Sequence, residues 1–283
     1  MMNLGADNQA LDSESFRAIA DLAYRESGLI LSEEKKAMIQ SRLRPRLKAL
    51  NMRDFPSYSS FVGSEAGTAE RPQLISALTT NVSHFFRENH HFELLCKAVL
   101  ERRLESLRNG GQLRIWSAGC SNGQEACSAA ISMLEHAPDI GRLDVRILGT
   151  DIDQKVVSFA RQGAYPESFL NNVPETIVRK YFTQETVDGT TMFKTKPAIS
   201  NLIRFNPLNL LADWPMKCKF DVIFCRNVVI YFDPDTQMRL WPRFRACLKS
   251  DGYLFLGHSE RIAAPDLYDF KAAGPTAYQP ANQ

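Results

Sequence analysis

Apolar positions change their spacing along the chain near residue 112. Before that point they recur every three or four residues, as Phe16, Ile19 and Ala23 do within 13–28. This spacing places apolar side chains on one face of an α-helix. We see no strand-like alternation in this half, so it is predicted to be all helical.

Local signals give these helices their expected ends. Ser13 is the expected N-cap of the first helix and Gly28 its end. Pro45 is expected to kink or divide the next helix. A short third helix is predicted around 55–61, and 77–107 is predicted to be helical with a polar interruption near 80–83.

Beyond residue 112, short apolar runs alternate with helical segments. The runs that predict strands are 113–119, 145–151, 220–225 and 252–257, and the helices are 124–137, 152–163 and 234–249. This alternation is typical of a parallel sheet covered on both faces, a doubly wound α/β fold.

Residues of about 164–202 interrupt the alternation and predict a small β insertion, with a hairpin turn at Asp188 and Gly189. We therefore expect an all-α N-terminal domain over 1–85 and an α/β domain over 86–283 that carries the insertion.

Composition narrows the class of protein. The chain has 283 residues, of which 44% are hydrophobic and 23% charged, as in ordinary globular proteins. Its cysteines show no C-x-x-C spacing and no signal-like segment begins the chain, which favours a reduced, cytoplasmic protein. No apolar run approaches a membrane span, so membrane insertion is not expected. A net charge of +2 gives no argument for nucleic acid.

One segment is strongly basic. Residues 33–53 carry seven Lys and Arg residues against Glu33 and Glu34. Such a run is ordinarily a solvated helix face, and the alternative is a docking surface for an acidic partner.

Polar clusters follow the predicted strands, where open α/β sheets bind their ligands. They are 117–125, Asp151, Arg226 with Asn227, and 258–260. Arg226 and Asn227 interrupt the apolar run FDVIFCRNVVIYF, and an unpaired buried guanidinium is very costly. We therefore expect the strand to end at Cys225 and the pair to line a ligand cleft.

The first cluster supports a hydrolase interpretation. Gly119, Ser121 and Gly123 match the nucleophile elbow G-x-S-x-G, and Asp233 and His258 follow in the order of α/β-hydrolases. Against it, the elbow would lie on the first strand of the unit and the motif is short. A plain glycine turn is also compatible.

The same cluster also supports a nucleotide cradle. Small residues let the backbone approach a ligand at a helix start, and Asp151 would then bind ribose hydroxyls. The pattern G-x-G-x-x-G is absent, which disfavours a dinucleotide and favours a ligand with a ribose but no phosphate.

Five motifs in order resemble one family. They are LTTNVSHFFRE (78–88), SAGCSNGQE (117–125), GTDID (149–153), FCRNVVIYF (224–232) and GHSE (257–260). Together they are similar to the bacterial chemotaxis receptor glutamate methyltransferases, the CheR family, from about residue 14 to 279.

The resemblance implies an activity and partners. Members of that family use S-adenosylmethionine, with S-adenosylhomocysteine as product, to methylate glutamates on the cytoplasmic helices of chemoreceptors. They have a helical domain, a methyltransferase domain and a β insertion. Some bind a receptor C-terminal peptide through that insertion, by adding a strand to its edge.

The resemblance also implies cofactor-binding residues, which are Asn81, Ser83, Arg87, Glu125, Asp151, Asn209, Leu210, Arg226 and Asn227. Ser83 stands where the family usually has Thr, and Gln-Glu-Ala-Cys at 124–127 replaces its usual Glu-Glu-Pro-Tyr. Arg42, Arg46 and Arg53 would steer an acidic receptor helix.

The implied chemistry needs no catalytic base, because a glutamate with a pKa of about 4.3 is already ionised. We therefore name no catalytic residue. His258 is interpreted as structural or cleft-lining, and Tyr231 as cleft-bordering or strand-end packing. His90 and His91 are interpreted as helix surface rather than a metal site. A third class, a non-catalytic module that binds the cofactor or a signalling partner, stays open.

Overall fold

The structure, a computed structural model, describes residues 10–281. They form two compact units. One unit holds the residues up to Thr80 together with Tyr231–Thr236, and the other holds Asn81–Ile230 and the residues from Gln237 onward. No helix within residues 10–281 is both long enough and apolar enough to cross a bilayer.

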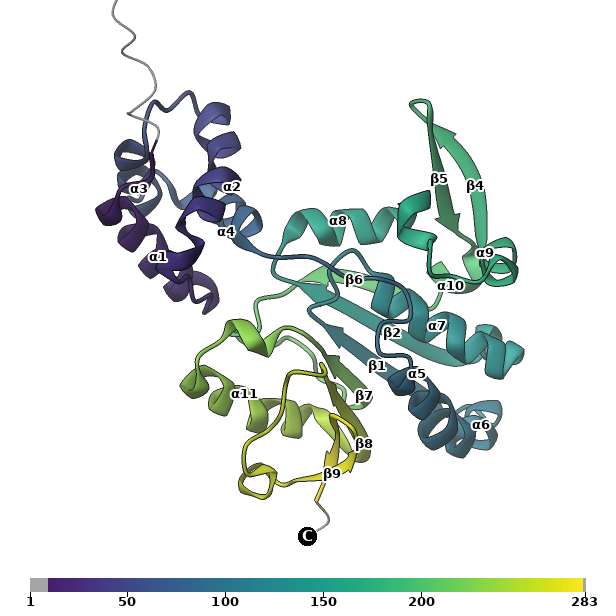
Figure 1. The fold of residues 1–283 in the computed structure, drawn as a ribbon. Coiled ribbons are helices and arrows are strands. Elements are labelled where there is room, and N and C mark those ends of the chain that lie inside the picture. The colour runs from purple at the N-terminus through teal and green to yellow at the C-terminus, as the bar shows by residue number, and fades with distance from the viewer. Residues whose placement is uncertain (1–9, 282–283) are drawn as a thin grey trace, which may run out of the picture. The chain divides into compact units, whose positions relative to one another are not determined.

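The first unit is helical, as predicted. Its α-helices are α1 (Ser13–Ser27), α2 (Lys36–Ala49), α3 (Phe55–Gly63) and α4 (Arg71–Leu78) (Figure 1). Phe16, Ile39, Phe55, Tyr58 and Leu74 are buried and belong to its core. The spacing of apolar residues predicted these helices correctly, because one face of each helix packs into the core.

The ends of α1 correct one prediction and confirm another. The N-cap is Asp12 rather than Ser13, because the Asp12 carboxylate accepts the Ser15 N–H at 2.8 Å and the Ser15 hydroxyl at 2.6 Å. Gly28 ends the helix with a φ of 72°, a left-handed conformation that glycine adopts without strain.

Pro45, which was expected to kink or divide the second helix, does not divide α2. The helix continues from Lys36 to Ala49. Its buried side chains are Ile39, Leu43 and Leu47, spaced four residues apart, while Pro45 is exposed. Packing along the buried stripe outweighs the one backbone hydrogen bond that a proline removes on the solvent side.

The second unit contains a seven-stranded sheet in the order β6-β2-β1-β7-β8-β10-β9 (Figure 1). The strands are β1 (Gln112–Ala118), β2 (Asp144–Asp151), β6 (Ile203–Pro207), β7 (Phe220–Cys225), β8 (Leu248–Leu256), β9 (Phe270–Gly274) and β10 (Ala277–Pro280). The first five in the sheet order are parallel, and β10 pairs antiparallel with β8 and β9.

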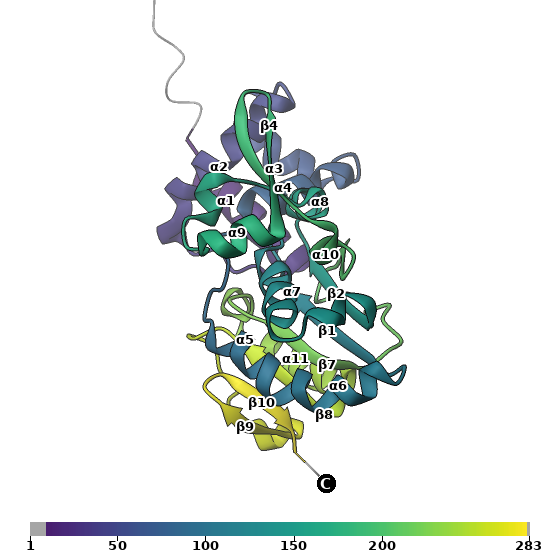
Figure 2. The ribbon, with the colours of Figure 1, turned by 90° about the vertical axis from the view of Figure 1, so that its right-hand side faces the viewer.

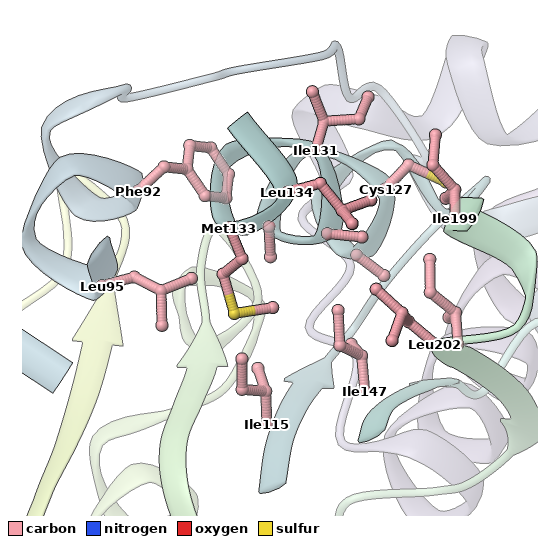
Figure 3. Close-up of a cluster of buried hydrophobic side chains, with 14 of the residues drawn as sticks. Phe92, Leu95, Ile115, Cys127, Ile131, Met133, Leu134, Ile147, Ile199 and Leu202 are labelled. Atoms are coloured by element: carbon pink, nitrogen blue, oxygen red, sulfur yellow. The ribbon is translucent and has the colours of Figure 1, made fainter. Parts of the chain in front are cut away.

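Neighbouring residues of a strand point to opposite faces of the sheet. Helices cover both of these faces (Figure 2). Ile115 of β1 packs toward α7 (Gln124–His136), and Figure 3 shows Met133 of that helix above it. On the other face, the Trp116 ring lies 5.6 Å from Phe244 of α11 (Pro234–Cys247). The doubly wound α/β prediction is confirmed.

The chain enters the second unit through a non-helical segment longer than expected. Residues 79–89 form no helix, whereas the interruption was predicted only near 80–83. Phe86 and Glu88 have φ values of 57° and 54°, which a helix does not tolerate. A continuous helical run then follows, made of α5 (His90–Leu94), a π-helical stretch (Leu95–Leu100) and α6 (Glu101–Arg108).

The predicted hairpin is present between α8 (Gln154–Gln162) and β6. It consists of β4 (Phe182–Val187) and β5 (Thr190–Thr195), with the turn at Asp188 and Gly189, both at positive φ. The strand β3 (Ala164–Pro166) completes a three-stranded sheet in the order β3-β5-β4, and α9 (Glu175–Tyr181) and α10 (Pro197–Ser200) flank the hairpin.

Candidate functional site

The turn after β1 is shaped by close backbone contacts. The N–H groups of Gly119 and Cys120 both donate to the Thr150 carbonyl, at 2.8 and 2.9 Å. Gly119 has a φ of 88°, and a Cβ there would lie 2.3 Å from the Val228 side chain. The turn therefore requires glycine at this position, and it brings the loops after β1, β2 and β7 together.

Asp151, at the end of β2, anchors this turn. Its carboxylate accepts the N–H of Ser121 at 2.9 Å and that of Asp153 at 3.0 Å. Burial raises the pKa of Asp151, and these backbone hydrogen bonds oppose the shift. Each oxygen accepts one of these bonds, so lone pairs remain that can accept hydroxyl groups of a ligand.

Asn81 joins the entry segment to the same turn. Its carbonyl accepts the Ser121 hydroxyl at 2.8 Å, and its side-chain amide donates to Asp153 at 2.7 Å. Ser83 is half-buried in the same segment. The structure thus brings Asn81 beside the loop that holds Asp151.

Arg226 lies immediately after β7, as the sequence predicted, and its side chain is buried but paired. Its guanidinium lies 3.2 Å from a Glu125 oxygen and 3.4 Å from a Glu88 oxygen, and it donates to the Arg87 carbonyl. It also stands 5.5 Å from the centre of the Phe92 ring. These two carboxylates explain how a charged group is tolerated inside an apolar run.

The pKa values of those two carboxyl groups move in opposite directions. Burial raises the pKa of Glu125, against the effects of Arg226 and of the Ser117 hydroxyl 2.7 Å away. Burial also opposes ionisation of Glu88, but the Arg226 charge and hydrogen bonds from His258 outweigh it and lower the pKa of Glu88. Arg87 is half-buried and donates to the Val82 carbonyl at 3.2 Å.

The interpretation of His91 as helix surface is wrong, although His90 is exposed. His91 is fully buried, and its ring stacks on Phe255 with centroids 4.7 Å apart. Its Nε2 lies 3.2 Å from the Pro275 carbonyl, so this nitrogen carries the hydrogen. The helix buries this residue because β8 lies against that side of it.

The two histidines and Glu88 are close enough to hold a metal ion, since their ligand atoms lie within 4.8 Å of one another. The carboxylate of this group, Glu88, comes from the segment just before the two histidines. The Arg226 guanidinium lies 3.4 Å from the same Glu88 carboxylate, however, and supplies a positive charge there. We assign no metal to the cluster.

Glu260 organises the site, a role that the sequence did not reveal. Its buried carboxylate accepts four backbone N–H groups at 2.6–3.2 Å, from Asn227, Val228, Ile230 and Gly257. Burial raises its pKa and these bonds oppose that rise. The only sequence signal was an acidic residue directly after a strand.

Asn227 adopts its unusual backbone because of this anchor. Its φ is 58°, and a Cβ at Gly257 would lie 2.7 Å from its backbone nitrogen. The loops after β7 and β8 are therefore packed against each other around Glu260. Asn227 itself is half-buried.

Asn209 and Leu210 lie just beyond β6, after Leu208. The Leu208 N–H donates to the Asp151 carbonyl at 2.9 Å, which places this segment beside the end of β2. Asn209 accepts the Leu211 N–H at 2.9 Å, and Leu210 is buried. Asp151, Asn209, Leu210, Arg226 and Asn227 thus lie at or just beyond the carboxyl ends of β2, β6 and β7, and Glu125 lies in the first turn of α7.

The residues of the hydrolase interpretation have other partners. The Ser121 hydroxyl donates to Asn81, and His258 Nδ1 lies 3.1 Å from Glu88. Asp233 accepts from the Tyr24 hydroxyl and the Thr236 N–H. Among residues 10–281 no serine–histidine–aspartate triad forms around Ser121, so the elbow motif is a glycine turn.

The three arginines of the basic segment lie in the first unit. Arg46 makes two hydrogen bonds to buried Glu70, at 2.8 and 2.7 Å, and Arg42 donates to the carbonyls of Leu78 and Thr79. Arg53 is exposed. Two of the three guanidiniums thus hold the helices of their own unit together.

Comparison with known proteins agrees with this architecture. The family model described as "CheR methyltransferase, SAM binding domain" matches residues 81–277, and "CheR methyltransferase, all-alpha domain" matches 14–79. A probable chemotaxis protein methyltransferase of Rhizobium etli is 45% identical, over 91% of this chain and 96% of its own.

Two further relatives extend the comparison. Chemotaxis protein methyltransferase 2 of Pseudomonas aeruginosa is 40% identical, over 95% of this chain and 93% of its own. The chemotaxis protein methyltransferase of Escherichia coli is 37% identical, over 95% of this chain and 91% of its own. Both family models and these full-length relatives lead to one conclusion: the chain belongs to the CheR methyltransferase family and is an S-adenosylmethionine-dependent chemotaxis protein methyltransferase.

Proposed function

We propose that this protein methylates glutamate side chains on the cytoplasmic helices of chemoreceptors, and that it does so in the cytoplasm. The products are glutamate methyl esters and S-adenosylhomocysteine. The observation that carries the proposal is the edge of the sheet where a glycine turn, the buried acid Asp151 and the ion-paired Arg226 lie at the carboxyl ends of adjacent strands.

The residues at this edge fit the cofactor. Asp151 retains acceptor capacity for a ribose diol, because each of its oxygens accepts only one of the two backbone hydrogen bonds from Ser121 and Asp153. The Arg226 Nε is buried and has no hydrogen-bond partner among the described residues, so it is available to a ligand. Asn209 and Leu210 are proposed to contact the adenine end.

The remaining residues would hold the methionyl end. We assign this role to Arg87, whose fork suits a carboxylate, and to Glu125, whose carboxylate suits an ammonium group. Asn81, Ser83 and Asn227 would complete the contacts. Glu260 and Glu88 fix the loops that carry these groups.

The chemistry places modest demands on the protein. When bound, S-adenosylmethionine supplies an electrophilic methyl group on a positively charged sulfur. A glutamate carboxylate oxygen attacks the methyl carbon, the carbon–sulfur bond breaks, and its electron pair stays on sulfur. No proton moves, so the residues of the site align the reacting groups and exclude water rather than act as a base.

Receptor recognition is proposed to involve both units. Arg53, exposed on the helical unit, would attract the acidic receptor helix, with Arg42 and Arg46 adding positive charge. In the insertion, β4 is an edge strand of its sheet and its residues are largely exposed. A receptor C-terminal peptide would add a strand there, and saturable binding of that peptide in a titration would test this.

A methyl-transfer assay tests the function. The protein is incubated with methyl-labelled S-adenosylmethionine and a receptor cytoplasmic fragment, and base-labile label on the fragment is counted. We expect label on glutamates that is lost when those glutamates are changed to alanine. Ser121→Ala should keep methyl transfer within a few fold, since its hydroxyl only donates to Asn81. Cofactor binding without transfer to any receptor fragment would instead indicate a non-catalytic module.

A further inference from the structure

A cavity of about 540 Å³ lies in the second unit, outside the loops described above. It is lined by residues of α7, α8, β5, α10 and β6, and it therefore lies between the insertion and the edge of the main sheet. Its buried lining is apolar and includes Ile199, Ile203 and Phe205. A volume of this order is typical of small-molecule sites.

The exposed lining is positively charged. Arg161, Lys194 and Arg204 all line the cavity, and no Asp or Glu does. None of the three makes an ion pair within residues 10–281, whereas Arg108 and Arg114 of the same unit each pair with an aspartate at 2.7 Å. Three cations therefore gather at one cavity without a compensating carboxylate.

The two guanidiniums are held in place by hydrogen bonds to backbone carbonyls and to the side chain of Asn206. Arg161 donates from Nε to the Phe205 carbonyl at 2.8 Å and from Nη2 to Asn206 at 3.2 Å. Arg204 donates from Nη1 to the Ile203 carbonyl at 2.7 Å. Each guanidinium keeps further N–H groups for a ligand, and a fixed arginine fork is well suited to phosphate oxygens.

We propose that this cavity binds a small phosphate-bearing molecule of the mononucleotide class, at a site separate from that of S-adenosylmethionine. The apolar floor would take the compact body of the ligand, and Arg161, Lys194 and Arg204 its phosphates. A small molecule is favoured over an acidic peptide because the apolar surface lies at the floor of a cavity.

Calorimetry with the cofactor site filled tests the proposal. The full-length protein is saturated with S-adenosylhomocysteine and titrated with ADP, adenosine or a glutamate-rich peptide. We expect ADP to bind more tightly than adenosine. The double variant Lys194→Glu/Arg204→Glu should lose at least tenfold in ADP affinity. A control, Lys97→Glu/Arg102→Glu, makes the same charge change at exposed residues outside the cavity and should match the parent.

Four results would overturn the proposal: no ADP binding, equal affinity for ADP and adenosine, equal ADP affinity in the two double variants, or tighter binding of a glutamate-rich peptide than of ADP. S-adenosylhomocysteine affinity, measured separately, should be unchanged in Lys194→Glu/Arg204→Glu. Calorimetry measures ADP binding directly, so this test does not depend on whether the protein transfers methyl groups to a receptor.

Discussion

Arg226 illustrates what one residue in the sequence can reveal. The cost of a buried charge predicted that β7 ends before it, and the strand does end at Cys225. Its partners were not predictable, because Glu125 lies 101 residues away in the sequence and no local rule connects the two. The pattern thus located a polar position, and only the fold supplied the carboxylates that neutralise it.

The buried carboxylate of Glu260 leads to a prediction about stability. Glu260→Gln replaces one acceptor oxygen with an N–H₂ group that must face backbone donors. We expect unfolding free energy to fall by about 2–4 kcal/mol, since buried donors lose their partner. Chemical denaturation measures this loss of unfolding free energy, and Glu105→Gln, at an exposed position of α6, is the control. Equal losses in both variants would show that the carboxylate is not an anchor.

His91 gives a pH-dependent prediction. Burial, together with the Arg226 charge, lowers the pKa of His91 to about 3 from its usual 6.5. Between these values the unfolded chain binds a proton that the folded chain does not, so stability falls as pH falls below 6.5. Between pH 6.5 and pH 5 this effect lowers the free energy of unfolding by about 2 kcal/mol.

His91→Gln keeps a donor for the Pro275 carbonyl but does not titrate. We therefore expect its unfolding free energy to fall less steeply than that of the parent between pH 6.5 and 5. Denaturation at several pH values measures both curves. Parallel curves would mean that His91 is protonated in the folded protein as readily as in the unfolded one.

At the scale of elements, the sequence located long periodic segments and missed short ones. The hairpin was predictable because Asp188 and Gly189 form a specific turn between two alternating segments. The strand β6 was missed because IRFNP has only five residues and follows an irregular insertion. The pair β9 and β10 was missed because its strands are short and complete the sheet by antiparallel pairing.

The basic helix α2 gives a prediction that separates stability from recognition. Arg46→Glu breaks the bidentate pair with buried Glu70 and should lower unfolding free energy by about 3 kcal/mol or more. Arg53→Glu should leave stability unchanged and raise KM for the receptor several-fold, with cofactor affinity unaffected. Arg25→Glu, at an exposed position of α1, is the matched control. Identical KM values for the Arg53 and Arg25 variants would remove Arg53 from the docking surface.

At the scale of the whole molecule, composition and alternation were enough to predict an all-α unit followed by a doubly wound α/β unit. The candidate site followed from one general rule, that ligands bind beyond the carboxyl ends of parallel strands. That rule named Asp151 and Arg226 but not the contribution of Glu88, which comes from a segment that precedes the sheet. Long-range pairings of this kind depend on the assembled fold.

The S-adenosylhomocysteine affinity of Asp151→Asn shows whether the cofactor binds at the end of β2, because this change keeps an acceptor for the Ser121 N–H but removes the charge. Calorimetry should show at least tenfold weaker binding, as expected for loss of charged hydrogen bonds to a ribose. The control Asp139→Asn, at an exposed ion pair with Arg108, should bind like the parent. If Asp151→Asn binds as tightly as the parent, the cofactor does not lie against the end of β2 and the central claim is contradicted.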